Sequence, residues 1–258
     1  MRMTETVKQL LIINIIFFIG SNYVGDVAYQ LFSEYYPESP NFRIWQPLTS
    51  MFMHAQVYGE GSSVGITHIL FNMLALVSFG SALEHFWGAK KFIFFYISCG
   101  LGAALLHTGV NYYQYHHALS LLQEASVPQE VINALLKDGQ YNNSLLEIVP
   151  LSTIENMYFA YNTPSLGASG AIYGLLTAFA FMFPNAELGL MFIPIPIKAK
   201  YFVPGLLAID LFLGFKGGSI FGNGGTGIAH FAHIGGALTG FIMMWYWKRN
   251  QFNKNRWN

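Results

Sequence analysis

The sequence predicts an all-α membrane protein with six transmembrane helices in a single membrane domain over residues 1–258. Only 10% of the residues are charged, whereas about 25% are charged in an ordinary soluble domain, and 53% are hydrophobic. Apolar runs recur along the chain, and several approach the length of about 20 residues that a helix needs to cross a bilayer. The net charge of zero and the lack of a basic block argue against a nucleic-acid partner.

Each predicted span is an apolar run bounded by polar residues. The six spans cover residues 8–29, 66–84, 91–112, 167–184, 201–215 and 229–247. The fifth span is the weakest, because it is short and contains Asp210. The first follows a short polar segment and has no small-residue cleavage pattern, so we expect a retained helix instead of a removed signal peptide.

Basic residues orient these helices. With the N-terminus inside, the inner segments hold ten basic residues: Arg2, Lys8, Lys90, Lys91, Lys198, Lys200, Lys248, Arg249, Lys254 and Arg256. The outer segments hold three: Arg43, Lys137 and Lys216. Together these account for all 13 Lys and Arg residues. An excess of Lys and Arg on the inner side predicts that both termini lie inside.

Two outer segments raise separate expectations. Residues 113–165 are too polar to span and contain a predicted short helix, 128–137, ended by Gly139, so we expect a partly helical loop lying on the outer membrane surface. Residues 216–227 hold six glycines in twelve positions. Glycine lowers the cost of hinge motion, which suits a lid over a site and equally a passive connector.

Polar residues inside the spans are the first functional signal, because polar groups are costly in a bilayer. His68 and Asn72 lie four residues apart on one face of the second span. Ser169 opens the fourth span within GASGAIYG, and His230 and His233 open the sixth. Taken singly, each could be a polar side chain bonded across a helix pair, and the small residues around Ser169 suit helix packing.

Their common depth favours a catalytic site. The second, fourth and sixth spans all run from outside to inside, and each carries its polar group in its first two turns. At 1.5 Å per residue, their depths differ by only about one turn. A hydroxyl, an imidazole and an amide in one layer are the groups that acyl transfer needs.

Glycines predict which histidine meets the serine. Close contact between the fourth and sixth spans is expected from five glycines: Gly170, Gly174, Gly235, Gly236 and Gly240. His233 directly precedes this glycine step, so we expect it to be the base for a Ser169 nucleophile, within about 2.6–3.2 Å. His230 lies one turn nearer the surface and is expected to be solvated or bonded to a loop. Tyr173, one turn below Ser169, is placed to orient the imidazole.

Other proteolytic chemistries lack their residues in the sequence. No histidine begins an H-E-x-x-H pair, and the soluble hydrolase motif G-x-S-x-G is interrupted by Ala171. Asp210 has no evident partner for an aspartyl pair, and no third catalytic carboxylate is evident beside serine and histidine. We therefore expect a dyad that needs neither metal nor cofactor.

Five segments of the chain, in order, resemble the rhomboid serine proteases, which are intramembrane peptidases with a six-span core. The matching segments are WQPLTSMFMH, HILFNM, GSALEHFWGAKKFIFFY, GASGAIYG and AHIGGALTG. The resemblance covers most of the chain. The chain departs from compact members of that family in two places: the long segment 113–165, and AQVYGEGSSVG between His54 and His68. These two departures bear on the choice of substrate.

The resemblance implies a role for each motif residue. Ser169 would be the nucleophile and His233 the base. His68 and Asn72 would line the oxyanion hole with the Ser169 backbone N–H, and Tyr173 would lie beneath the histidine. Glu84 at the inner end of the second span would be structural.

The resemblance implies an integral membrane endopeptidase that cleaves transmembrane-helix protein substrates entering from the lipid bilayer between the second and fifth spans. A bacterial plasma membrane, with the site toward its outer side, is the expected location. A non-catalytic rhomboid-like protein that binds membrane helices for quality control is the alternative. Loss of the serine or the histidine marks such proteins, and both residues are present here.

Overall fold

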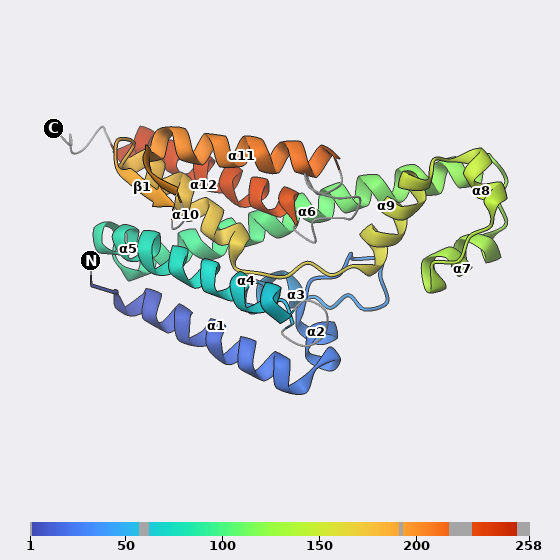
Figure 1. Ribbon diagram of the computed structural model, residues 1–258, viewed down its shortest axis with the longest axis horizontal. Helices are drawn as coiled ribbons and strands as arrows, with labels where there is room; N and C mark the ends of the chain where they lie inside the picture. The colour runs from blue at the N-terminus through green and yellow to red at the C-terminus, as the bar shows by residue number, and fades with distance from the viewer. Residues whose placement is uncertain (1, 57–61, 191–192, 217–228, 252–258) are drawn as a thin grey trace.

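Helices occupy all six of the predicted positions in the computed structural model, which describes residues 2–56, 62–190, 193–216 and 229–251. They are α1 (Glu5–Val24), α4 (Ser62–Ala75) with α5 (Ser81–Trp87), α6 (Ala89–Glu124), α10 (Ser169–Met182), α11 (Ala199–Lys216) and α12 (His230–Gln251). A π-helical turn, η2 (Leu76–Gly80), joins α4 to α5. Figure 1 shows these helices side by side at one end of the molecule.

Three of the described helical segments are long and apolar enough to cross a membrane: residues 5–24, 65–87 and 89–124. The helix α10 is apolar but has only 14 residues, short of the roughly 20 that a span needs. The helix α11 carries Lys200, Asp210 and Lys216 within 18 residues. Three of the six predicted spans thus meet the criterion of length and composition.

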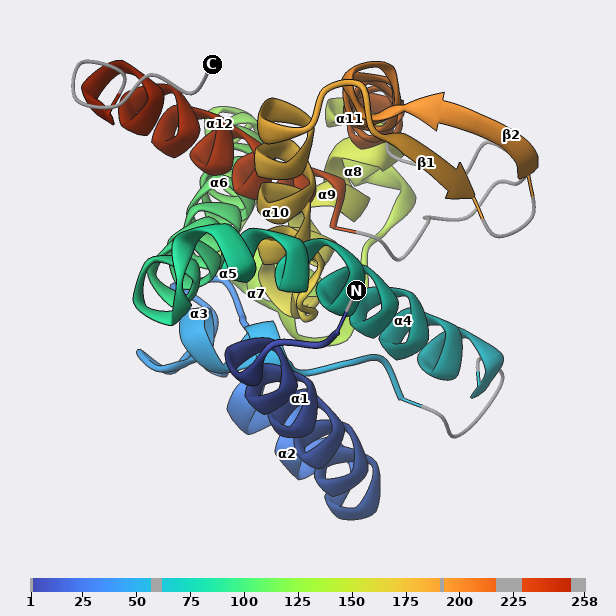
Figure 2. The ribbon, with the colours of Figure 1, turned by 90° about the vertical axis from the view of Figure 1, so that its left-hand side faces the viewer.

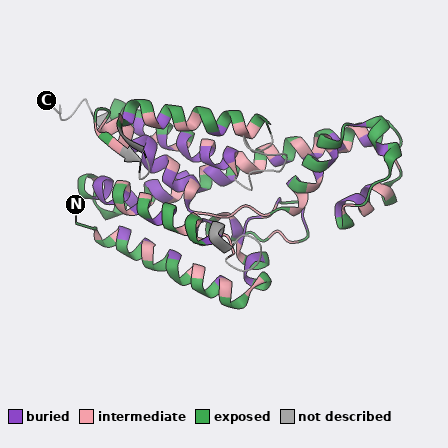
Figure 3. Cartoon of the chain, in the orientation of Figure 1, coloured by how far each residue is buried: buried purple, intermediate pink, exposed green. Residues whose placement is uncertain are grey.

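The centre of the helical bundle is formed by α6, α10 and α12. Figure 3 shows buried residues concentrated along α10 and α12, whereas α1 and α11 are largely exposed. The bundle core (Leu76, Leu83, Phe92, Phe95, Tyr96, Cys99 and Leu175 among its fully buried members) lies between α10, α6 and the α4–α5 segment. This packing gives α10 and α12 fixed positions at the middle of the bundle.

Glu84 attaches α1 to the bundle. Its carboxylate accepts the backbone N–H groups of Thr6 at 3.1 Å and Val7 at 3.0 Å, and also the Thr4 hydroxyl. These N–H groups belong to the first turn of α1, where they lack partners within the helix. Glu84 therefore caps one helix from another, which agrees with the structural role expected for it.

The third span is predicted to end at residue 112, and the helix that carries it, α6, continues to Glu124. Buried Tyr115, Ala118 and Leu122 recur at helical spacing in this extension, so it has an apolar stripe of its own. The segment 113–165 is partly helical, as expected, with α7 (Gln129–Asp138), α8 (Asn143–Ile148) and α9 (Leu151–Asn162).

The extension of α6 and the helices α7, α8 and α9 enclose a second hydrophobic core, which we call the insertion core. Its fully buried members include Leu122, Ile132, Leu135, Ile154 and Met157. Gly139 ends α7 in the left-handed conformation, with φ of 67°, as the sequence predicted. Tyr115 and Tyr161 stack where this segment begins and ends, with ring centroids 5.4 Å apart. Figure 1 shows it projecting from the bundle.

A two-stranded antiparallel sheet departs from the all-α prediction. The strands β1 (Glu187–Leu190) and β2 (Ile193–Lys198) pair Glu187 with Lys198 and Leu188 with Ile197. The sequence IPIPIK of β2 alternates isoleucine with proline, whose fixed φ favours extended backbone at a sheet edge. Figure 2 shows this hairpin leading into α11.

The remaining short helices lie in the first outer segment. They are α2 (Asp26–Phe32), α3 (Gln46–Thr49) and the 3-10 turn η1 (Ser50–Phe52). Gln46, fully buried, binds four backbone groups there, donating to the carbonyls of Gln30 and Asn41 and accepting the N–H groups of Tyr35 and Arg43. These bonds hold the segment together, and its elements α3 and η1 contact α6 and α10.

Candidate active site

Ser169 and His233 lie in hydrogen-bond contact. The distance between Ser169 Oγ and His233 Nε2 is 2.9 Å. Ser169 is the first residue of α10, and His233 lies in the first turn of α12. Gly167, two residues before the serine, has φ of 129°, which disfavours a side chain, and a Cβ there would lie 3.1 Å from His68. The loop before α10 therefore needs glycine to place the serine beside these two imidazoles.

Glycines bring α10 and α12 together, as the sequence predicted. A Cβ on Gly236 would lie 1.8 Å from the carbonyl oxygen of Gly170, and one on Gly240 would lie 2.9 Å from the Cα of Gly174. Backbone touches backbone along this contact. Gly235 differs from the prediction, because it faces the Gly102 carbonyl in α6 instead of α10.

Asp210, for which the sequence offers no second carboxylate, contacts the imidazole of His233. Its Oδ1 lies 3.1 Å from His233 Nδ1, on the opposite side of the ring from Ser169. A carboxylate only accepts hydrogen bonds, so Nδ1 carries the ring proton and Nε2 is left to accept the serine hydroxyl. The three side chains form a continuous line of hydrogen bonds, which the expected dyad lacked.

His230 is also placed differently from the expectation of a solvated or loop-bonded residue. It is buried, and its Nδ1 lies 2.5 Å from the same Asp210 oxygen. Tyr173 stacks on the His233 ring, with centroids 4.1 Å apart and planes 12° apart, and its hydroxyl donates to Asp210 Oδ2 at 2.5 Å. Three donors thus surround one buried carboxylate, and Tyr173 contacts both that carboxylate and the imidazole.

One sequence signal could have identified Asp210. A carboxylate inside an apolar segment is costly unless it is paired, and this cost makes such a residue a site candidate by default. The same carboxylate lowers the hydropathy of its span and so weakens the prediction of the helix that carries it.

His68 and Asn72 are placed differently from one another. The Ala55 N–H donates to His68 Nδ1 at 3.3 Å, so the other ring nitrogen, Nε2, carries the proton next to Gly167. The Asn72 amide donates to the His68 carbonyl of its own helix at 2.7 Å. His68 therefore presents a donor toward the Ser169 region, whereas one of the two Asn72 amide hydrogens is already used within α4.

Asp210, His230 and His233 are also the residues, within the described part of the chain, whose ligand atoms could surround a metal ion, since these atoms lie within 4.8 Å of one another. Bonds of about 2.0–2.1 Å to a tetrahedral zinc would separate two ligand atoms by about 3.3 Å. The 2.5 Å between His230 and Asp210 is shorter than that. The spacing fits a shared hydrogen bond better than a shared ion.

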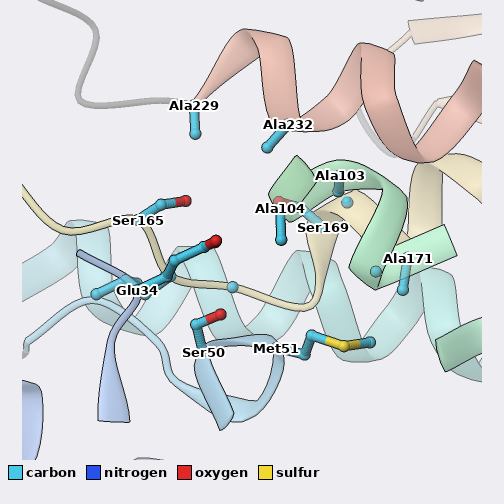
Figure 4. Close-up of a pocket in the computed structure, with 14 residues that line it drawn as sticks. Glu34, Ser50, Met51, Ala103, Ala104, Ser165, Ser169, Ala171, Ala229 and Ala232 are labelled. Carbon is cyan, nitrogen blue, oxygen red and sulfur yellow. The ribbon is translucent and has the colours of Figure 1, made fainter. Parts of the chain in front are cut away.

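A small pocket opens beside Ser169, and Figure 4 shows the residues that line it in close-up. Glu34, Ser50 and Ser165 contribute polar atoms to its wall, and α6 contributes glycine and alanine. The loop predicted to be a lid precedes α12 in the chain, but its residues 217–228 lie outside the described residues.

The chain matches the family model described as a rhomboid domain over residues 41–250. It is 26% identical over 191 residues to RHOMBOID-like protein 12, mitochondrial, of Arabidopsis thaliana, covering 74% of this chain and 45% of that protein. It is 26% identical over 180 residues to Rhomboid protein 1, mitochondrial, of Saccharomyces cerevisiae, covering 69% and 37%. It is also 26% identical over 146 residues to Rhomboid protease GluP of Bacillus subtilis, covering 57% and 26%.

The chain thus spans less than half the length of these relatives. Four relatives that match carry mitochondrial names, which does not fit the expected bacterial plasma membrane. The apolar helices and the family model agree in indicating an integral membrane protein. Because the family model covers most of the sequence, this chain belongs to the rhomboid family.

Proposed function

We propose that the chain is an intramembrane serine endopeptidase that hydrolyses peptide bonds in or near transmembrane segments of its substrates. The line of hydrogen bonds from Ser169 through His233 to Asp210 carries this proposal. Nucleophile, base and orienting carboxylate come from three helices and meet at hydrogen-bond distances. Helix packing requires the glycines of α10 and α12, but it does not require this polar line.

In the proposed reaction, His233 Nε2 takes the hydroxyl proton as Ser169 Oγ attacks the substrate carbonyl carbon. The tetrahedral oxyanion collapses, the peptide C–N bond breaks, and His233 returns the proton to the leaving amine. Water, deprotonated by His233, then hydrolyses the acyl-enzyme and restores the serine. Asp210 holds the His233 tautomer and stabilises the imidazolium, and Tyr173 restricts both the His233 ring and the Asp210 carboxylate.

The oxyanion needs donors aimed at where its charge develops. Two stand next to the nucleophile: the Ser169 backbone N–H, which lies at the N-terminus of α10, and the protonated Nε2 of His68. Asn72 would supply its second amide hydrogen. Removing one such donor costs about 2.7–4 kcal/mol at comparable sites.

The substrate side of the proposal rests on the membrane placement. We propose a single domain with six spans and both termini inside, supported by the ten-to-three distribution of basic residues. The site then lies toward the outer side, where a substrate helix entering from the lipid bilayer between α4–α5 and α11 would unwind. No metal or cofactor takes part in the proposed steps.

Labelling and turnover together test this function. Wild-type protein in detergent should react with a fluorophosphonate probe and cleave a reporter transmembrane helix. Ser169→Ala should lose the label, and Ser169→Ala and His233→Ala should each lower kcat by on the order of 10⁴-fold or more. Ser152→Ala, an exposed serine in α9, is the matched control and should behave as wild type. Sustained turnover by Ser169→Ala would refute the serine mechanism, and an unlabelled, inactive wild type would favour the non-catalytic alternative.

A further inference from the structure

His230 is a buried histidine to which the proposed reaction gives no role. It is the first residue of α12, lies one turn before His233, and is only 7% exposed. Its Nδ1 lies 2.5 Å from Asp210 Oδ1, whereas Nδ1 of His233 lies 3.1 Å from the same oxygen. Of the two imidazoles, the one outside the proposed reaction is therefore bound more closely to the carboxylate.

Asp210 can accept from both imidazoles at once. Because a carboxylate only accepts hydrogen bonds, Nδ1 of His230 carries a proton, as Nδ1 of His233 does. The two rings are nearly perpendicular, with planes 87° apart and centroids 6.3 Å apart, so each N–H can approach a different lone pair of Oδ1. Tyr173 donates to the other oxygen, Oδ2. Donors on both oxygens fix the plane of the carboxylate.

The helix that carries Asp210 has few other attachments in its second half. Helix α11 lies along α12 (Figure 1), and beyond Val203 its single buried residue is Asp210. Gly214 follows one turn later, and a Cβ there would lie 3.1 Å from the Phe231 ring and 3.4 Å from the Cβ of His230. The second half of α11 therefore meets α12 at two points, and His230 belongs to both.

Loss of the His230 N–H would free the carboxylate to move. A buried charge that loses a donor turns toward the donors that remain or draws in water, since leaving it unsatisfied is costly. Either movement changes the hydrogen bond to His233, which is the longer of the two. His233 must keep its proton on Nδ1 so that Nε2 can take the proton of Ser169. The orientation of the base therefore depends on His230 through Asp210.

We propose that His230 is a positioning residue, which holds the Asp210 carboxylate in the orientation from which it orients His233. The inference rests on the proposed function and adds a further member to its line of hydrogen bonds. Packing alone is the alternative, since an imidazole also fills space between α11 and α12. Positioning requires an N–H donor directed at Asp210, whereas packing requires only a side chain of similar shape.

Two substitutions of nearly equal shape separate these roles. Asparagine places an amide N–H where the imidazole places Nδ1, and leucine branches at the same atom without a donor. His230→Leu should lower kcat about 10- to 100-fold and change KM less than about twofold, because a donor to a buried charge is lost. His230→Asn should stay within about threefold of the wild-type kcat, because it retains the N–H. The full chain in detergent, a reporter transmembrane helix and the thermal midpoint provide the measurements.

A double-mutant cycle with Asp210 provides a second readout. If His230 acts through Asp210, His230→Leu should cause no further fall in kcat once Asp210→Asn has removed the carboxylate, whereas a packing defect would multiply the two losses. His117→Leu, the same substitution at an exposed histidine of α6, is the matched control and should leave kcat unchanged. If His230→Leu does not fold, His230→Met repeats the comparison with a more adaptable apolar side chain.

Four results would each overturn the positioning role: wild-type kcat in folded His230→Leu, equally low kcat in the Leu and Asn variants, losses that multiply in the cycle, or failure of both apolar variants to fold. Failure of the proposed function looks different. Wild type that fluorophosphonate does not label refutes the serine mechanism, and folded Asp210→Asn with wild-type kcat refutes the role of the carboxylate. Labelled, active wild type with any of the four results refutes only the role of His230.

Discussion

The bundle and the insertion, residues 113–165, differ in which side chains they bury and which they expose. Helix α1 in the bundle buries Asn14 and exposes Ile12, Ile16 and Ile19. Helix α7 in the insertion buries leucine and isoleucine and exposes polar residues such as Lys137. Apolar surface is stable against lipid and costly against water, so the two regions are built for different solvents. The site lies in the bundle, near the junction between them.

The difference also decides which polar contacts matter. In the bundle, a buried polar atom that has a partner depends on that partner, because lipid offers no replacement; Asn14, which accepts from His54 at 2.9 Å, is an example. In the insertion, an exposed polar side chain can exchange its partner for water. Removal of one polar group should therefore lower activity or stability strongly in the bundle and hardly at all in the insertion.

The largest expected contrast is between two aspartates. Asp210→Asn in the bundle should lower kcat by about 10³-fold or more with little change in KM, because the amide cannot hold the His233 tautomer. Asp138→Asn at the exposed end of α7 should leave kcat unchanged. Steady-state kinetics and the thermal midpoint in detergent would be measured for both. If folded Asp210→Asn kept wild-type kcat, the carboxylate would be a packing element only.

Two buried leucines test whether the cores are independent. Leu175→Ala in α10 and Leu135→Ala in α7 each remove a fully buried side chain, at a cost of about 2–5 kcal/mol. Leu135→Ala should increase proteolytic cleavage within residues 126–162 and keep fluorophosphonate labelling of Ser169. Leu175→Ala should reduce the labelling. Equal loss of labelling in both variants would mean that the two cores unfold as one unit.

The smallest effect is the pH dependence of stability at the junction. Burial raises the pKa of Glu34 from 4.5 to about 7 in the folded chain. Between these two pH values, the folded state keeps a proton that the unfolded state has released. Stability should therefore fall as pH rises from about 4.5 to about 7 and then level off, by at most about 3 kcal/mol. Glu34→Gln should lack this part of the pH dependence in detergent unfolding at pH 5 and pH 8. Parallel pH profiles for the two proteins would contradict the assignment.

Hydropathy and motifs predicted the helices and the pairing of Ser169 with His233, because both depend on short patterns within single segments. The glycine step within the sixth span also predicted the contact between α10 and α12. The sequence predicts a span that ends at residue 112, where the polarity of the chain rises, whereas α6 continues to Glu124. Its stripe of Tyr115, Ala118 and Leu122 was the signal that the helix continues.

The role of Asp210 could not be assigned from the sequence because its partners lie 20, 23 and 37 residues away on two other helices. Spacing along the chain does not reveal how α11 is rotated about its axis. The same holds for Glu34, whose position depends on a backbone bridge to Ser165 across 131 positions of the chain. Contacts of this kind follow from tertiary packing and not from local pattern.

The stacked Tyr115 and Tyr161 have a consequence for how this chain could have grown. Residues 116–160 leave and rejoin the bundle at Tyr115 and Tyr161, whose rings are in contact. The segment is therefore a closed loop with its own hydrophobic core. Lengthening such a loop raises the entropic free-energy cost of closing it only slightly, by about 0.6 kcal/mol for each doubling of its length. Relatives could gain, lose or exchange this segment by a single genetic event without moving the nucleophile, which makes it the natural place for lineages to diverge while the chemistry stays the same.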